Sequence, residues 1–289
     1  MKVRVHATIA NFGPGFDVFG VGIGEPYDEL SFRESDEWSI RVEGFPVPAD
    51  ETNVAVVAAR ALARLVGEDV PLELKLRKGI RPGSGLGSSG ASSLAGALAM
   101  ARVLGVEDEG LILRAAMEGE RAASGSAHPD NVVPAYYGDF TIISTPLHVD
   151  RIPVDFRVAV VLPEVEVPTR EARRALPGKV PIGDAVSNVA LAASLVKALI
   201  EGDMERAGMF LDDRIALPYR LKLMPWYGTV RRAAMEAGAW GFSVSGSGPA
   251  VFALGEDVVQ IGKAIVEAFE GLGISAKAYV ARAGVGVVP

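Results

Sequence analysis

The stretch Pro82-Gly83-Ser84-Gly85-Leu86-Gly87-Ser88-Ser89-Gly90-Ala91 holds four glycines and three serines within ten residues. An alternating apolar pattern over residues 72–77 precedes it, and an alanine-rich apolar segment that runs to about Leu104 follows it. A strand, a glycine turn and a helix start in this order favour a phosphate-binding loop, because glycines let the backbone approach an anion and the first N–H groups of a helix attract negative charge. An ordinary Gly/Ser surface loop is the simpler alternative.

Two other types of nucleotide loop fit the stretch poorly. The chain has no G-x-x-x-x-G-K-[ST] pattern, which excludes a Walker A loop. Residues 85–90 match G-x-G-x-x-G, but a dinucleotide site needs an acidic residue at the end of a second strand. The acid at that spacing, Asp108, instead opens a helical segment.

With the small residues after it, the loop resembles the nucleotide loop of the galactokinase, homoserine kinase, mevalonate kinase and phosphomevalonate kinase (GHMP) superfamily. Gly90-Ala91 departs mildly from the Ala-Ala pair that usually follows the serines in this family. The resemblance implies that the loop holds the phosphates of ATP through Pro82, Gly83, Ser84, Gly85, Leu86, Gly87, Ser88, Ser89 and Gly90.

Composition limits the other classes of function. The chain has 289 residues, 49% of them hydrophobic, which is enough for a large core or two medium ones. The net charge of −7 argues against nucleic acid or an anionic membrane as a partner. Cysteine is absent, and neither a signal peptide nor an apolar run of membrane-spanning length is evident. We therefore expect a cytoplasmic protein.

A second motif lies near the N-terminus, after a strand expected over residues 2–8. On physical grounds Asn11 and Asp17 read as turn formers on either side of Gly13-Pro14-Gly15, although a carboxylate between two apolar residues needs a partner. The stretch from Ala7 to Asp17 resembles the N-terminal motif of the homoserine kinase branch of the superfamily. This resemblance implies that Asn11 and Asp17 bind an amino-acid substrate.

Glu120 conflicts with the pattern of the helix expected over residues 109–123. It falls on the apolar face, one turn after Met117, where a carboxylate needs a cation or several donors. It could also turn to solvent or pair with a neighbouring arginine. The family resemblance implies that Glu120 binds Mg²⁺ together with Ser88 or Ser89, of which Ser89 is the first choice.

The stretch from His128 to Gly138 resembles the His-x-Asp-Asn-Val-x-Pro segment of homoserine kinases. Mevalonate kinase relatives carry an aspartate as base seven residues before this glycine, and Asn131 occupies that place here. The resemblance therefore implies a reaction without a side-chain base, with Asn131 at the catalytic position and His128 near the substrate. Asp130 is expected to be a helix cap or a surface group.

The third motif, residues 243–250, alone reads as a tight hairpin and resembles the family's Ser-Gly-x-Gly-Pro loop beside the phosphates and substrate. The pattern of the second half predicts a four-stranded sheet with helices on one face. We expect its longer helices over 182–201, 203–213 and 219–238.

The resemblance implies an α+β fold of two domains with the active site between them. The N-terminal ATP-binding domain, residues 1–150, would be a mixed sheet with helices, and the chain would cross between Pro146 and Pro153. The C-terminal domain, residues 151–289, would be a ferredoxin-like α/β sandwich. Members of the family are often dimers, so a homodimer is among the expected partners.

The activity that the resemblance implies is ATP-dependent phosphorylation of L-homoserine, a step toward threonine. Arginines in this half are more often surface groups, but Arg173 and Arg220 match best the positions that hold the substrate carboxylate, and Arg214 is a weaker candidate. The alternatives are a sister kinase acting on mevalonate, shikimate or a sugar, and a non-catalytic ATP-binding regulator. The residues expected to orient homoserine are Asn11, Asp17, His128, Thr169, Arg173 and Arg220.

Overall fold

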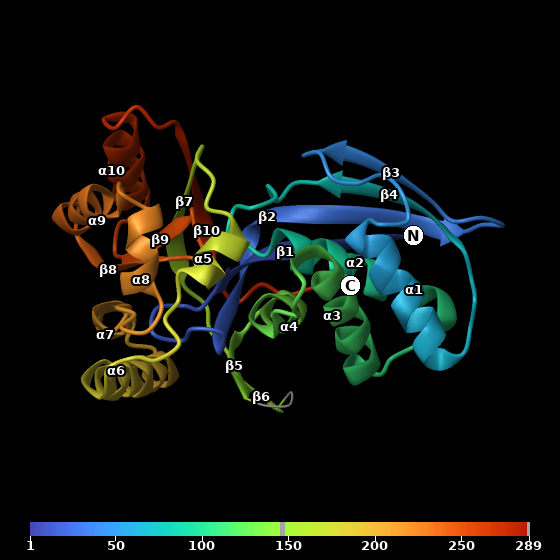
Figure 1. Cartoon of the computed structure of the whole chain (residues 1–289), viewed down its shortest axis with the longest axis horizontal. Coiled ribbons are helices and arrows are strands. Elements are labelled where there is room, and N and C mark those ends of the chain that lie inside the picture. Colours follow the sequence, from blue (N-terminus) through green and yellow to red (C-terminus); the bar gives the residue numbers. More distant parts are fainter. Residues whose placement is uncertain (145–147, 288–289) are drawn as a thin grey trace.

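The structure is a computed structural model that describes residues 1–144 and 148–287. Its two sheets lie side by side, and each is covered by helices (Figure 1). The first sheet lies in the half of the molecule that also holds the labelled N-terminal end, and the second sheet lies in the other half.

Six strands form the first sheet, and β2 is its centre. One edge of β2 pairs along its length with β1, while the other edge pairs with β4 through residues 29–34 and with β5 through residues 19–21. Only β3 and β4 run parallel, so the sheet is mixed, as predicted. The strands are β1 (Lys2–Ala10), β2 (Phe19–Glu34), β3 (Ser39–Gly44), β4 (Leu72–Lys78), β5 (Phe140–Ser144) and β6 (His148–Ile152).

The segment expected to cross between domains instead contributes a strand. β6 pairs antiparallel with β5, so the chain stays in the first sheet until Ile152. Pro146 lies outside the described residues. We propose that the boundary between the domains lies between Ile152 and Arg157, slightly beyond the expected residue 150.

Four helices cover the first sheet: α1 (Val54–Val66), α2 (Ser88–Leu104), α3 (Glu109–Ser124) and α4 (Pro129–Tyr137). α2 is the innermost, with nearly every residue buried between the sheet and its neighbours. Its small residues permit this, because a Cβ at Gly96 would lie 2.0 Å from the carbonyl oxygen of Ala55. α1 begins at Val54, and Asn53 before it accepts the capping hydrogen bond from Ala55 N at 2.9 Å.

The second sheet has four antiparallel strands in the order β10-β7-β9-β8, which confirms the predicted strand number. The predicted helix over 219–238 is instead three shorter helices, and Pro225 lies in the break between the second and the third. The elements are β7 (Arg157–Pro163), α5 (Thr169–Arg174), α6 (Ile182–Glu201), α7 (Met204–Met209), α8 (Leu217–Arg220), η1 (Leu221–Leu223), α9 (Tyr227–Glu236), β8 (Ala239–Val244), β9 (Val251–Gly255), α10 (Val258–Glu270) and β10 (Ala276–Arg282).

Helices cover both faces of the second sheet, which corrects the prediction of one face. Along β7, Val158 and Val160 join the core that includes α6 and α7, whereas Ala159 and Val161 join the core with α9 and α10. Successive residues of a strand point to opposite faces of the sheet. Because all four residues from Val158 to Val161 are buried, helices must cover both faces.

The segment after β10 returns to the first sheet. Ala283 forms a bridge with Ile23 of β2, and Gly284 N donates to Gly22 O at 3.0 Å. Val287 N then donates to Tyr136 O of α4 at 3.2 Å. Strands and helices of the first domain are thus held by residues from near the far end of the chain.

Candidate active site

A cleft of about 800 Å³ lies where the two domains meet. The phosphate loop and α3 line it from the first domain, and α5, α8 and the 246–247 turn line it from the second. Leu86 and Gly90, although predicted in the site, are buried behind the lining. The cleft brings together most of the predicted site residues: Asn11, Asp17, Pro82, Gly83, Ser84, Gly85, Gly87, Ser88, Ser89, Glu120, His128, Asn131, Thr169, Arg173 and Arg220.

The phosphate loop has a backbone that requires glycine. Gly83, Gly85 and Gly87 have φ of +69°, +80° and +71°, a region that side chains with a Cβ disfavour. Gly87 immediately precedes α2, and a Cβ there would lie 2.3 Å from Thr8 Oγ1 and 2.9 Å from Asn131 Oδ1. The loop is therefore closely fitted between β1 and α4, with its backbone and the N-terminus of a long buried helix at the cleft.

The third sequence motif contacts this loop from the second domain. Ser245 Oγ donates to Gly85 O at 2.7 Å, and Ala250 N donates to Ser84 O at 3.0 Å. A Cβ at Gly85 would lie 2.5 Å from Ser245 O. The two motifs, far apart in the sequence, thus fix each other's position.

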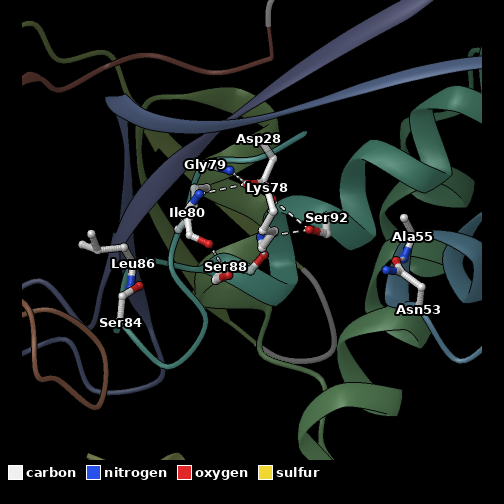
Figure 2. A network of polar contacts seen from close by, with 10 residues as sticks. All are labelled: Asp28, Asn53, Ala55, Lys78, Gly79, Ile80, Ser84, Leu86, Ser88 and Ser92. Carbon is white, nitrogen blue, oxygen red and sulfur yellow. Dashed lines mark hydrogen bonds and ion pairs between the residues drawn. The ribbon is translucent and has the colours of Figure 1, made fainter. Parts of the chain in front are cut away.

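A buried ion pair lies beneath the start of α2 (Figure 2). Lys78 Nζ contacts the Asp28 carboxylate and also donates to Ser88 O at 2.7 Å and Ser92 Oγ at 2.9 Å. Burial lowers the pKa of Lys78, and the nearby Asp28 opposes that effect. The second oxygen of Asp28 accepts from the backbone N–H groups of Gly79 and Ile80, both at 3.0 Å. This network ties the first turn of α2 to β2 and to the end of β4.

The two loop serines differ in what their hydroxyls do. Ser88 Oγ donates to Ile80 O at 2.9 Å, so it is engaged within the loop. Ser89 is half-buried and lines the cleft, and its hydroxyl has no hydrogen bond to any residue that the structure describes. Ser89 is therefore the better placed of the two for a ligand.

Glu120 is buried in α3, with 4% of its surface exposed, and it lines the cleft. It does not turn to solvent, and Arg121 pairs with Glu118. His128 Nδ1 lies 3.2 Å from Glu120 Oε1, and this hydrogen bond raises the pKa of His128. A carboxylate at this depth suits a hard cation or a charged imidazole.

The N-terminal motif is held by hydrogen bonds and an ion pair. Asn11 Oδ1 accepts from Asp17 N at 3.0 Å, while its Nδ2 donates to Gly246 O at 2.8 Å. Asn11 and Asp17 have φ of +66° and +57°, a conformation that Asn and Asp tolerate better than most residues. The Arg173 guanidinium takes both oxygens of Asp17, at 2.5 and 3.1 Å.

The three candidate arginines lie in different surroundings. Arg214 is half-exposed, contacts Asp212 at 3.5 Å and does not line the cleft. Arg173, at the cleft, is paired with Asp17, and Thr169 one turn earlier in α5 lies 3.3 Å from Ser247 through its hydroxyl. The surroundings of Arg220 single it out as the arginine that can receive an anion.

Arg220 is 5% exposed, and no carboxylate of a described residue lies within ion-pair distance of it. Its Nε donates to Ala172 O at 3.3 Å, and the adjacent nitrogen donates to Gly246 O at 3.2 Å. Its guanidinium also lies over the ring of Phe16, 5.0 Å from the centroid. Burial lowers the pKa of Arg220. A buried cation with only neutral acceptors favours an anionic ligand.

Family models match both halves of the chain: "GHMP kinases N terminal domain" at residues 53–139 and "GHMP kinases C terminal" at residues 195–274. The chain belongs to the GHMP kinase family. It is 75% identical to a homoserine kinase of Thermococcus gammatolerans, covering 100% of this chain and 99% of the relative. A homoserine kinase of Pyrococcus furiosus is 62% identical, with 99% of each chain covered.

A solved structure supports the same assignment. The crystal structure of homoserine kinase from Cytophaga hutchinsonii is similar with a TM-score of 0.91 and 36% identity, covering 100% of this chain and 97% of that one. The two-domain GHMP kinase fold predicted from the motifs is thereby confirmed.

In this GHMP kinase, Asp130 is neither a helix cap nor a surface group, which corrects the prediction. It is 4% exposed, lies in the first turn of α4 and lines the cleft, while His128 is the capping position. Burial, with the nearby Asp17 charge, raises the pKa of Asp130 to about 7. Asn131 beside it accepts a hydrogen bond from Thr8 Oγ1 at 3.0 Å, which holds its amide against the phosphate loop.

Sequence reasoning also missed Lys78 and Asp28 of this GHMP kinase. A signal for Lys78 was present, because it continues the inward-facing register of Leu72, Leu74 and Leu76 along β4. A lysine in that register needs a buried acid, and Asp28 faces it from β2. Asp28 carried a similar signal, because it shares the inward-facing register of Leu30 and Phe32 along β2.

Proposed function

We propose that this GHMP kinase transfers the γ-phosphoryl group of ATP to the side-chain hydroxyl of L-homoserine, giving O-phospho-L-homoserine. The whole-chain likeness to homoserine kinases supports this reaction. The observation that carries it is one of geometry: the phosphate loop and the charged side chains of the N-terminal motif, α5 and α8 open on a single cleft. The same cleft thus offers a nucleotide end and an amino-acid end.

At the nucleotide end, the loop from Pro82 to Gly90 receives the phosphates through its backbone and the N-terminus of α2. The cleft is also lined by apolar residues of the 47–54 segment and of α3, which suit the nucleoside: Val47, Pro48, Val54, Ala122 and Ala123.

Glu120 and Ser89 would hold Mg²⁺ between the two ends. The donors fit the ion, because Mg²⁺ in kinases takes one or two carboxylates and completes its shell with phosphate oxygens and water. Consistent with few protein ligands, the described residues include no cluster of three or more His, Cys, Asp or Glu side chains suited to a metal. When bound, the ion neutralises charge on the transferring phosphate.

At the acceptor end, the substrate carboxylate binds Arg220, and Asn11, Asp17, His128, Thr169 and Arg173 complete the surroundings. The ammonium group needs a carboxylate, and the cleft offers Asp17 and Asp130. Asn131 lies beside the phosphate loop, where it can orient the hydroxyl. No side-chain base is required, since a metaphosphate-like transition state depends mainly on positioning and charge neutralisation.

We further propose that the enzyme acts in the cytoplasm as a homodimer. One helix, α6, supports the dimer, because Ile182, Val186, Val189 and Ile200 are each more than half exposed along it. On length and composition alone, this is also the one described helix that could span a membrane. The dimer is tested by measuring the molar mass in solution by light scattering: Val189→Glu on α6 should give a monomer, whereas the control Val259→Glu on α10 should remain a dimer. Binding of the unmodified chain to lipid vesicles would instead indicate that α6 contacts a membrane.

The function is tested by kcat/KM for L-homoserine, mevalonate, shikimate and galactose at a fixed concentration of Mg-ATP. We expect homoserine to exceed the other three. A higher value for any of them would assign the chain to a sister kinase. ATP hydrolysis that no acceptor accelerates would indicate a non-catalytic regulator.

A further inference from the structure

Asn188 is a buried polar side chain in a largely exposed part of α6. It is 5% exposed, whereas Val186 and Val189 beside it on the helix are 63% and 68% exposed. Among the residues in the ranges 1–144 and 148–287, those that line the cleft include none from α6. A buried amide costs free energy unless it is hydrogen-bonded, so its partners indicate what it does.

The amide of Asn188 joins two segments that are far apart in the sequence. Its Nδ2 donates to Pro14 O at 2.8 Å, in the loop between β1 and β2. Its Oδ1 accepts from Arg214 N at 3.0 Å, in the connection between α7 and α8. One bond needs the donor of the amide and the other needs its acceptor, so together they fix its orientation. Asn188 therefore ties a loop of the first domain to a segment of the second.

Both segments lead to the acceptor end of the cleft. Shortly after Pro14 comes Phe16, and the guanidinium groups of Arg173 and Arg220 lie over its ring, 5.3 and 5.0 Å from the centroid. Shortly after Arg214 comes α8, which ends at Arg220. Asn188 thus holds both the aromatic ring beneath the Arg220 guanidinium and the segment that carries Arg220.

We propose that Asn188 is a positioning residue for the acceptor end, which sets where Arg220 lies relative to the N-terminal motif without contacting the substrate. This inference rests on the proposed function, because it deepens the role given there to Arg220. Without the amide, the loop and the Arg220 side chain must be ordered when the acceptor binds. That cost would appear as a higher KM for the acceptor.

The short helix that carries Arg220 needs such support. α8 has four residues, Leu217–Arg220, which is too short for its own hydrogen bonds to stabilise it. Asp213 accepts hydrogen bonds from the backbone N–H groups of residues 215–217, at distances of 2.7 to 2.9 Å. Asp213 shapes the turn from within its own segment, whereas Asn188 fixes that segment to α6 and to the first domain.

The two segments also lie against each other, so a shift of one reaches the other. A Cβ at Gly13 would lie 2.9 Å from Leu211 Cα. Gly246 O accepts from Asn11 Nδ2 at 2.8 Å and from a guanidinium nitrogen of Arg220 at 3.2 Å. The acceptor end is therefore one connected unit, and Asn188 anchors it from behind the cleft.

The test compares two substitutions on the same helix. Asn188→Leu removes both hydrogen bonds with a side chain of similar size, and it should raise KM for L-homoserine about tenfold. The kcat and the KM for ATP should change less than about threefold, because the amide does not contact the phosphate loop. Leu195→Ala, fully buried two turns later, is the matched control. It should lower the melting temperature but leave KM for homoserine within about twofold.

A double-mutant cycle tests whether Asn188 acts through Arg220. In an Arg220→Leu background, Asn188→Leu should raise KM further by less than about twofold, because the group that it positions is already absent. Effects that multiply in full would show that Asn188 acts independently of Arg220 and would overturn the inference. An equal rise of KM in Leu195→Ala would overturn it in favour of general destabilisation.

If Asn188→Leu does not fold, Asn188→Asp decides the question. It has nearly the same shape, keeps the acceptor for Arg214 N and loses only the donor to Pro14 O. KM for homoserine should rise at least about threefold, again with little change in kcat. An unchanged KM beside an active unmodified chain would refute this inference alone. An unmodified chain that fails to phosphorylate homoserine would refute the proposed function and the inference with it.

Discussion

The two proposed ends of the cleft, one for the nucleotide and one for the acceptor, are built on different plans. The nucleotide end comes from one continuous stretch of ten residues whose positive φ angles and helix start present backbone N–H groups. The acceptor end comes from side chains on the β1–β2 loop, α4, α5 and α8, which belong to both domains. Recognition by backbone is local to one stretch of the sequence, whereas recognition by side chains depends on the tertiary fold. The following predictions test this contrast.

The largest effect is expected where the two ends meet. Glu120→Ala should lower kcat by about 10²-fold or more, the scale of losing an electrostatic contact in the transition state. Glu118→Ala on the same helix, exposed and paired with Arg121, is the control and should behave like the unmodified chain. The role of Glu120 as a Mg²⁺ ligand is checked by titrating Mg²⁺ in both variants and measuring ATP binding and the reaction rate. If the Mg²⁺ dependence of Glu120→Ala were unchanged, Glu120 would have a structural role instead.

The acceptor end should respond through KM. Arg220→Leu is expected to raise KM for homoserine by roughly 30- to 100-fold while ATP affinity is kept, since a buried charge contact with the substrate is lost. Arg214→Leu, outside the cleft, should change KM little. If Arg173→Leu rather than Arg220→Leu gave the larger increase, the substrate carboxylate would belong to Arg173.

The nucleotide end should respond to backbone crowding. Gly87→Val and Gly83→Val both place a β-branched residue at positive φ, but only Gly87 has Thr8 within 2.3 Å of the added Cβ, while nothing lies within 4 Å at Gly83. We expect Gly87→Val to weaken ATP binding by at least about tenfold more than Gly83→Val, equivalent to about 1.4 kcal/mol. Calorimetric titration of folded variants decides it, and equal affinities would contradict a close fit at Gly87.

The smallest effect is on stability. The pKa of Asp130 is about 7 in the folded chain against 3.8 as the ordinary value. Its raised pKa means that the group favours the folded state below about pH 4 and that this contribution is lost as the pH rises through 7. Asp130→Asn removes that dependence on pH. The difference in melting temperature, variant minus unmodified chain, should therefore be a few degrees larger at pH 8 than at pH 5. A difference that stays constant with pH would contradict the shifted pKa.

The contrast between the ends explains what the sequence could predict. The phosphate loop was predicted from glycine spacing between a strand pattern and a helix pattern, and the structure has a strand, loop and helix there. The acceptor residues came only through resemblance to a family, because no local pattern relates Asn11 to Arg220. Their joint exposure to one cleft depends on how the domains pack.

The errors have physical causes of the same kind. Asp130 read as a surface group because a short helix with polar residues carries no sign of which face the rest of the fold will cover. The predicted helix over 219–238 overlooked Pro225, which ends η1 before α9 begins. The prediction placed all helices on one face of the second sheet, whereas α6 and α7 lie on the opposite face from α9 and α10.

The return of residues 283–287 to the first sheet also has a consequence for synthesis on the ribosome. β2 is made early, yet its contacts at Gly22 and Ile23 are completed by Gly284 and Ala283. About 260 residues separate the partners, so at about 5–20 residues per second these contacts wait roughly 10–50 s. The first domain therefore emerges from the ribosome well before these contacts can form.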